Sequence, residues 1–139
     1  VDQILKDKFK DVNTNIEIIH NYPIVNLFQE HLSNIQKKNL IYVGGLTKIR
    51  GILEAIKAFT VLLEEEPDAK LYFVGDFIHA KYKEHVISYC HSNRLENNVI
   101  FTGHVSHDKV PMYLNKASIA IGLLQPNPRY ELAIPVKLF

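Results

Sequence analysis

Short apolar runs alternate with longer amphipathic stretches between residues 39 and 124, and this alternation limits the possible folds more than any other feature. The runs are continuous rather than alternating, which is typical of strands buried on both faces of a parallel sheet. The stretches between them carry apolar residues at helical spacing. Such a chain forms right-handed strand–helix–strand units, with helices on both faces of a parallel sheet. The sequence therefore predicts an α/β domain.

The predicted elements follow from these patterns and from the Gly, Pro and Asn residues that separate them. The predicted strands span residues 40–43, 70–74, 99–101 and 118–124. The predicted helices span residues 52–65, 78–93 and 106–116, the last of them capped by Ser106. Before this region we expect a helix over 1–10, a turn at 13–15, a strand over 16–19, and a loop with a short helix over 24–38.

The composition narrows the class of protein further. A chain of 139 residues with 47% hydrophobic and 22% charged residues is typical of one soluble globular domain. A net charge of +1 gives no electrostatic reason to expect a nucleic acid partner. The apolar runs fall short of the roughly 18–20 residues needed to cross a bilayer. The single cysteine excludes an internal disulfide or a cysteine-rich zinc site, and it favours a reducing, cytoplasmic location.

The carboxyl ends of the predicted strands are where a ligand should bind, because open parallel sheets bind ligands at that edge. Gly44 and Gly45 follow the first strand, and without a Cβ they let the backbone approach a ligand closely. The next helix begins near Gly51, so its free N–H groups and positive dipole end suit an anion. Arg50 adds donors for phosphate oxygens. The spacing fits neither the dinucleotide fingerprint nor the P-loop, which argues against NAD and ATP. The alternative is a tight turn beside a solvated arginine.

Two further segments reach the same edge. Gly103 ends the third strand, and its neighbours His104 and Val105 could contact a nucleotide base. Beyond the fourth strand, Glu131 could accept hydrogen bonds from sugar hydroxyls, and Lys137, near a helix start, could neutralise a phosphate. The alternative for this last segment is a surface loop with ordinary charges. The histidines lack the neighbouring ligands that a zinc site needs, so no metal is expected.

Taken in order, four segments of the chain resemble the C-terminal domain of the group 1 (family 4) glycosyltransferases. Residues 18–21 resemble the family's interdomain linker, and residues 42–51 resemble its first glycine-rich loop. Residues 99–105 resemble its base-contacting strand and loop, and residues 135–139 resemble the start of its C-terminal donor-binding helix. The resemblance implies a Rossmann-like three-layer domain with a parallel sheet, the C-terminal half of a GT-B glycosyltransferase. It places linker and interdomain segment over 1–38 and the donor-binding domain over 39–139.

The sequence departs from the family pattern at two places. Gly45 stands where relatives often have arginine, which leaves Arg50 as the main phosphate ligand of the loop. Relatives also carry two glutamates eight positions apart. The second of these would fall just after Phe139, and counting back puts the first at Leu132, one place past Glu131.

The resemblance also implies an activity for the full-length protein. It would transfer a sugar, with retention, from a nucleoside diphosphate sugar to an acceptor hydroxyl, in surface polysaccharide or glycoconjugate biosynthesis. No metal or other cofactor is implied. This chain would hold no catalytic residue, although Arg50 and Lys137 would stabilise the departing diphosphate. The acceptor site would lie in a missing N-terminal domain, and peripheral contact with the inner face of the membrane would belong to the full-length protein.

Both ends of the sequence are expected to be cut, since the last residues read as the first turn of a helix without a stop. Two alternatives stay open. A UDP-sugar 2-epimerase shares the two-domain fold, and a non-catalytic nucleotide-sugar-binding module would share the site without the reaction. A flavodoxin-like receiver domain would need several aspartates at the strand ends, where only Asp76 stands.

Overall fold

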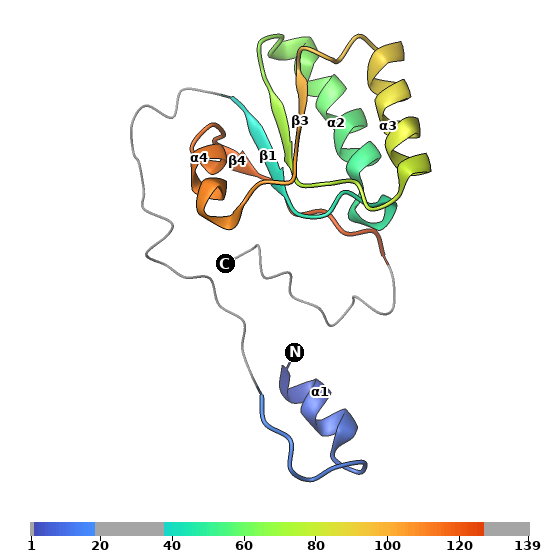
Figure 1. Ribbon diagram of the computed structural model, residues 1–139, viewed down its shortest axis with the longest axis vertical. Helices are drawn as coiled ribbons and strands as arrows, with labels where there is room; N and C mark the ends of the chain where they lie inside the picture. Colours follow the sequence, from blue (N-terminus) through green and yellow to red (C-terminus); the bar gives the residue numbers. More distant parts are fainter. Residues whose placement is uncertain (1, 19–37, 127–139) are drawn as a thin grey trace. The chain divides into compact units, whose positions relative to one another are not determined.

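A computed structural model describes residues 2–18 and 38–126 (Figure 1). The chain divides into two compact units, one formed by Val1–Ile24 with Pro126–Phe139 and the other by Val25–Gln125. In the first unit, α1 spans Asp2–Phe9, as the sequence predicts.

The predicted strand over 16–19 is wrong for residues 16–18, which pair with no other strand. The backbone here follows a local turn, in which the Asn15 N–H donates to Asn13 Oδ1 at 2.9 Å. An Asn side chain that bonds the backbone two residues on competes with strand pairing. Residue 19, and residues 24–37 of the loop with a short helix predicted over 24–38, lie outside the described residues.

The second unit holds a four-stranded sheet with the order β3-β2-β1-β4, and every pairing is parallel. The strands are β1 (Leu40–Val43), β2 (Leu71–Val74), β3 (Val99–Gly103) and β4 (Ile119–Ala120). The chain adds β2 and β3 on one side of β1 and then returns to place β4 on the other side. The reversal in strand order therefore falls between β1 and β4.

Two long helices cover one side of this sheet and a short one lies on the other (Figure 1). The long helices are α2 (Ile52–Glu65) and α3 (Ala80–Ser92), and the short one is α4 (Val110–Leu114). One turn of 3-10 helix precedes α2 and another precedes α4, namely η2 (Lys48–Arg50) and η3 (His107–Lys109). The predicted α/β architecture with a parallel sheet is confirmed.

The core lies between the sheet and the two long helices. Its fully buried side chains include Ile56 and Phe59 of α2, Phe73 of β2 and Val86 of α3. The predicted helix over 52–65 is correct at both ends, because its apolar residues recur at the spacing that buries one face.

The predicted strands over 70–74 and 99–101 are observed as β2 and β3 with small shifts at their ends, and three other predicted elements differ more. The helix predicted from residue 78 begins at Ala80, because the Ile78 N–H donates to Leu46 O and extended backbone runs on beside Leu46. Ile78 is 64% exposed and does not belong to the buried stripe. The strand predicted over 118–124 is only two residues long, although the Ile121 N–H still donates to Ile41 O. The helix predicted over 106–116 consists of η3 and α4.

Candidate functional site

Three glycines meet at the carboxyl ends of β1, β2 and β3. The Gly44 N–H donates to Val74 O at 2.9 Å, and the Gly75 N–H donates to Gly103 O at 3.1 Å. A Cβ on Gly75 would lie 2.2 Å from Gly44 O, and the Gly75 φ of 143° also requires glycine. The structure thus joins the predicted site residues Gly44 and Gly103 through Gly75. Gly75, which directly follows the predicted strand over 70–74, is not among the predicted site residues.

The glycine-rich loop after β1 places Arg50 close to Tyr42 of that strand. The Tyr42 hydroxyl, almost fully buried, donates to Gly45 O at 3.2 Å. Burial raises the pKa of Tyr42, and the Arg50 guanidinium opposes this rise through its charge and a hydrogen bond to the hydroxyl. Arg50 therefore lies beside the Tyr42 hydroxyl that holds Gly45. In the same loop the Thr47 hydroxyl is buried without a hydrogen-bond partner.

The N-terminus of α2 is less open to an anion than the sequence suggests. The Leu53 N–H, one of the first donors of the helix, already donates to the Tyr82 hydroxyl of α3 at 3.2 Å. The Glu54 carboxylate stands in the first turn, with Oε2 3.9 Å from the position of a Cβ on Gly51. The Tyr82 hydroxyl thus satisfies one free N–H of the helix terminus, and the Glu54 carboxylate places a negative charge near its positive end. A diphosphate would depend more on Arg50 and on the loop backbone.

The loop after β4 adjoins this first loop. The Gln125 N–H donates to Ile49 O at 2.8 Å, and Leu123 Cβ lies 3.4 Å from the position of a Cβ on Gly51. The segment that leads to the last two predicted ligands therefore starts beside η2. Those ligands, Glu131 and Lys137, lie outside the described residues, and their roles stay predictions.

The residues after β3 continue the same rim. His104 is exposed and Val105 is half-buried, and both follow Gly103 directly. Ser106 precedes η3 but makes no side-chain cap to its backbone. Its hydroxyl instead hydrogen-bonds the Asp108 carboxylate, which lowers the pKa of that group. The predicted side-chain cap is therefore wrong, and the hydroxyl hydrogen-bonds a nearby carboxylate instead of a backbone N–H of the helix.

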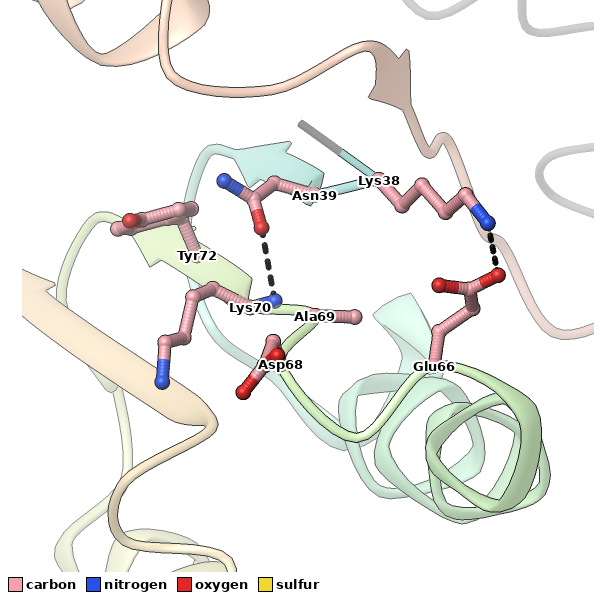
Figure 2. Close-up of a pocket in the computed structure, with 7 residues that line it drawn as sticks. All are labelled: Lys38, Asn39, Glu66, Asp68, Ala69, Lys70 and Tyr72. Carbon is pink, nitrogen blue, oxygen red and sulfur yellow. Dashed lines mark hydrogen bonds and ion pairs between the residues drawn. The ribbon is translucent and has the colours of Figure 1, made fainter. Parts of the chain in front are cut away.

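A hollow of about 440 Å³ lies at the opposite edge of the sheet, beside the amino-terminal ends of β1 and β2 (Figure 2). The Asn39 side chain there has a structural role, since its Oδ1 accepts the Lys70 N–H and its Nδ2 donates to Lys116 O, both at 2.9 Å. Lys38 forms an ion pair with Glu66. Figure 2 shows the hydrogen bond from Lys70 to Asn39 and the ion pair between Lys38 and Glu66.

Charge decides between the two edges. The amino-terminal hollow adjoins the C-terminal end of α2, where the helix dipole is negative and where Glu64, Glu65 and Glu66 follow one another. Lys38 and Lys70 also line this hollow, but Glu66 and Asp68 balance their charge, so it offers a diphosphate no excess of positive charge. The carboxyl-terminal rim instead offers glycine backbone and Arg50.

Two features that residues 2–18 and 38–126 lack bear on the class of site. These residues contain no helix long and apolar enough to cross a membrane. Within the same residues, His, Cys, Asp and Glu side chains form no group of three or more that could hold a metal ion.

A parallel sheet with helices on both faces defines the class of doubly wound α/β domains, which bind ligands at the carboxyl edge of the sheet. Within that class the family can be stated. Residues 24–125 match the family described as "Glycosyl transferases group 1", which covers most of the chain. The chain belongs to this family. No curated protein matches it significantly.

Solved structures share the fold at low sequence identity. HepE from Anabaena, solved with UDP and glucose, is 19% identical over 99% of this chain and 40% of its own, with a TM-score of 0.70. The C-terminal domain of the group 1 protein LpcC from Francisella tularensis is 23% identical over 60% of this chain and 45% of its own, with a TM-score of 0.54. S. aureus TarM, solved with UDP, is 16% identical over 78% of this chain and 19% of its own, with a TM-score of 0.56. The chain therefore spans less than half of each. The likeness is to the GT-B fold.

Proposed function

We propose that this chain binds the nucleoside diphosphate sugar donor of a glycosyltransferase. The observation that carries the proposal is the carboxyl-terminal rim of the sheet, where Gly44, Gly75 and Gly103 adjoin one another and Arg50 lies behind Gly45. Membership of the group 1 family supports it. So does the neighbour HepE, which was solved with UDP and glucose and with UDP-glucose.

The reaction of the full-length protein would be sugar transfer with retention. The bond between the anomeric carbon and the diphosphate oxygen breaks, a bond to the acceptor oxygen forms, and the acceptor hydroxyl loses its proton. Negative charge builds on the departing diphosphate, and fixed positive groups lower the barrier by stabilising it. Arg50 serves this role here, with Lys137 as the second predicted cation. Donor binding of this kind requires no metal.

The biological setting we propose follows the family resemblance alone. The acceptor is a hydroxyl of a surface polysaccharide or related glycoconjugate, and the reaction takes place in the cytoplasm at the inner face of the membrane. The acceptor-binding N-terminal domain supplies that partner and any peripheral membrane contact. By itself, the 139-residue chain binds nucleotide weakly and transfers no sugar. Detectable turnover by this chain would overturn the last point.

A charge-matched pair of variants tests donor binding. Calorimetric titration of the chain with UDP, GDP and ADP should give measurable binding of at least one. Arg50→Met should weaken it roughly tenfold to a hundredfold, because a hydrogen bond to a charged group contributes about 1.5–3 kcal/mol. Lys38→Met removes one positive charge at the opposite edge of the sheet and should leave affinity unchanged. Equal losses in both variants, or no binding of any nucleotide, would contradict the proposal.

A further inference from the structure

A second hollow opens at the carboxyl-terminal rim, on the side of the sheet that α3 covers. Its volume is about 170 Å³, and its walls come from the ends of β2 and β3 and from α3. Phe77, Phe101 and Ile87 form its apolar part, and Asp76 and Lys83 form its charged part. The hollow lies beside Gly75 and Gly103, at the far end of the rim from the reversal of strand order between β1 and β4.

The aromatic walls are held in place from behind. Phe101 stacks on the fully buried Phe73, with ring centroids 5.3 Å apart and planes at 12°. Phe77 packs against Phe101 at 5.3 Å and meets the edge of Tyr82 at 6.2 Å. Because each ring is packed by another, this wall does not have to be ordered when a ligand binds, and preorganisation of this kind favours affinity.

The two charged side chains are available to a ligand. Neither Asp76 nor Lys83 makes a side-chain hydrogen bond or ion pair with another residue in the described part of the chain. Asp76 Oδ1 lies 3.5 Å from the position that a Cβ on Gly103 would take, so the carboxylate borders the rim. One acceptor and one donor thus accompany an apolar wall, which is typical of small-molecule sites.

The size of the hollow limits what can enter it. A cavity of about 150 Å³ holds benzene in another protein, so a hollow of about 170 Å³ suits one six-membered ring rather than the fused rings of a purine. Resting on the proposed donor site, we infer that this hollow binds the pyrimidine ring of the donor nucleotide. Lys83 and Asp76 are then specificity-determining residues, and the donor is a pyrimidine nucleoside diphosphate sugar.

The chemistry of the ring matches these two side chains. A pyrimidine base presents carbonyl oxygen to a donor, and uracil also presents a ring N–H to an acceptor. Lys83 donates to the carbonyl oxygen and Asp76 accepts from the N–H. The exposed apolar surface of Ile87 closes one side of the ring, so its side chain also sets how wide a base can be.

Nucleotide titrations of the 139-residue chain test the inference. UDP and CDP should bind at least about tenfold more tightly than GDP and ADP, on the scale that one good base contact contributes. Lys83→Met keeps the aliphatic stem but removes the donor, and it should weaken UDP about tenfold while changing ADP little. Lys81→Met, on the same helix but outside the hollow, is the matched control and should change neither. Ile87→Ala widens the hollow and should raise the affinity for purine nucleotides relative to UDP.

The outcomes separate this inference from the proposed function. Arg50→Met should weaken all four nucleotides by the same factor and leave their ratios unchanged. Binding that is indifferent to the base, or a Lys83→Met variant that behaves like Lys81→Met, would overturn the pyrimidine pocket and leave the donor site standing. Tighter binding of GDP and ADP than of UDP and CDP would also overturn the pyrimidine pocket and leave the donor site standing. No binding of any nucleotide would overturn both. Urea unfolding of each variant shows that it is folded.

Discussion

The rim glycines differ in the space and the backbone angles that they need. Gly75→Ala should destabilise the chain by more than the roughly 1–3 kcal/mol that a strained backbone angle costs, because its Cβ would also lie 2.2 Å from Gly44 O. Gly45→Ala is the matched control. Its Cβ would meet only the flexible end of Ile78, at 3.2 Å, so it should cost less. Urea denaturation measures both, and equal losses would contradict the explanation.

Replacing Thr47 should stabilise the chain, whereas the glycine substitutions should destabilise it. Its buried hydroxyl has no partner, and an unsatisfied buried polar group costs about 1–3 kcal/mol. Its extended backbone, with φ −131° and ψ 160°, suits valine. Thr47→Val should therefore raise the free energy of unfolding by about 1 kcal/mol. Thr60→Val is the control. It removes a hydroxyl that donates to Lys57 O at 2.7 Å, so no gain in the free energy of unfolding is expected. A loss of stability in Thr47→Val would show that its hydroxyl is bonded in solution.

At this scale the sequence predicts positions better than contacts. Gly44 and Gly103 could be found because each directly follows an apolar run, and strand ends share one edge of a parallel sheet. The bond between Leu53 and Tyr82 joins residues on two different helices. No local pattern encodes that pairing, so the partly filled terminus of α2 could not be foreseen. The same holds for Arg50 beside Tyr42.

Among the elements, α3 carries the chain's only cysteine on its buried face. Burial, with the Glu96 carboxylate as a second cause, raises the pKa of Cys90 from 9.0 to about 11. At pH 8 only about one thiol in a thousand is then ionised, and the thiolate is the reactive form. We expect iodoacetamide to leave folded Cys90 almost unmodified at pH 8 and to alkylate it fully in urea, as measured by mass spectrometry. Rapid modification without urea would show that α3 opens readily.

The raised pKa of Cys90 also predicts how the stability of the chain changes with pH. The folded chain holds the Cys90 proton more tightly than the unfolded chain, so the stability from the neutral thiol is fully present below pH 9. It is lost as the pH rises from there toward about 11. Cys90→Ala should remove this part of the alkaline loss, which urea denaturation at several pH values would measure. An unchanged alkaline profile in Cys90→Ala would contradict the raised pKa.

The ranges of elements packed by several neighbours could be predicted, whereas the range of the exposed edge strand β4 could not. β1 and α2 match their predicted ranges because neighbours on several sides impose a regular apolar pattern. β4 pairs with β1 alone among the described strands, and its two residues are exposed. Residues 118–124 are apolar enough for a strand. The hydrogen bond from Gln125 to Ile49 shows that the chain has by then turned toward η2, so hydrophobicity overestimates the strand length.

At the scale of the whole molecule, the compact unit Val25–Gln125 coincides closely with the family match over residues 24–125. The sequence foresaw the sheet, but the family resemblance, rather than any physical pattern, supplied the proposed activity. What the physical pattern supplies is the placement of the proposed site. The order β3-β2-β1-β4 gathers loops distant in sequence at one edge.

The division into units makes a prediction that separates folding from binding. A chain trimmed to residues 25–125 keeps the whole sheet and its core, so its thermal midpoint should change by less than about 4 °C, the shift for 1 kcal/mol in a domain of this size. The trimmed chain lacks Glu131 and Lys137. Because the stabilisation by a ligand grows with the logarithm of one plus the ratio of its concentration to its Kd, UDP should raise the midpoint of the 139-residue chain more than that of the trimmed chain. A much lower midpoint without UDP would show that the sheet depends on the other unit. An equal rise with UDP in both chains would show that the segment after Pro126 takes no part in donor binding.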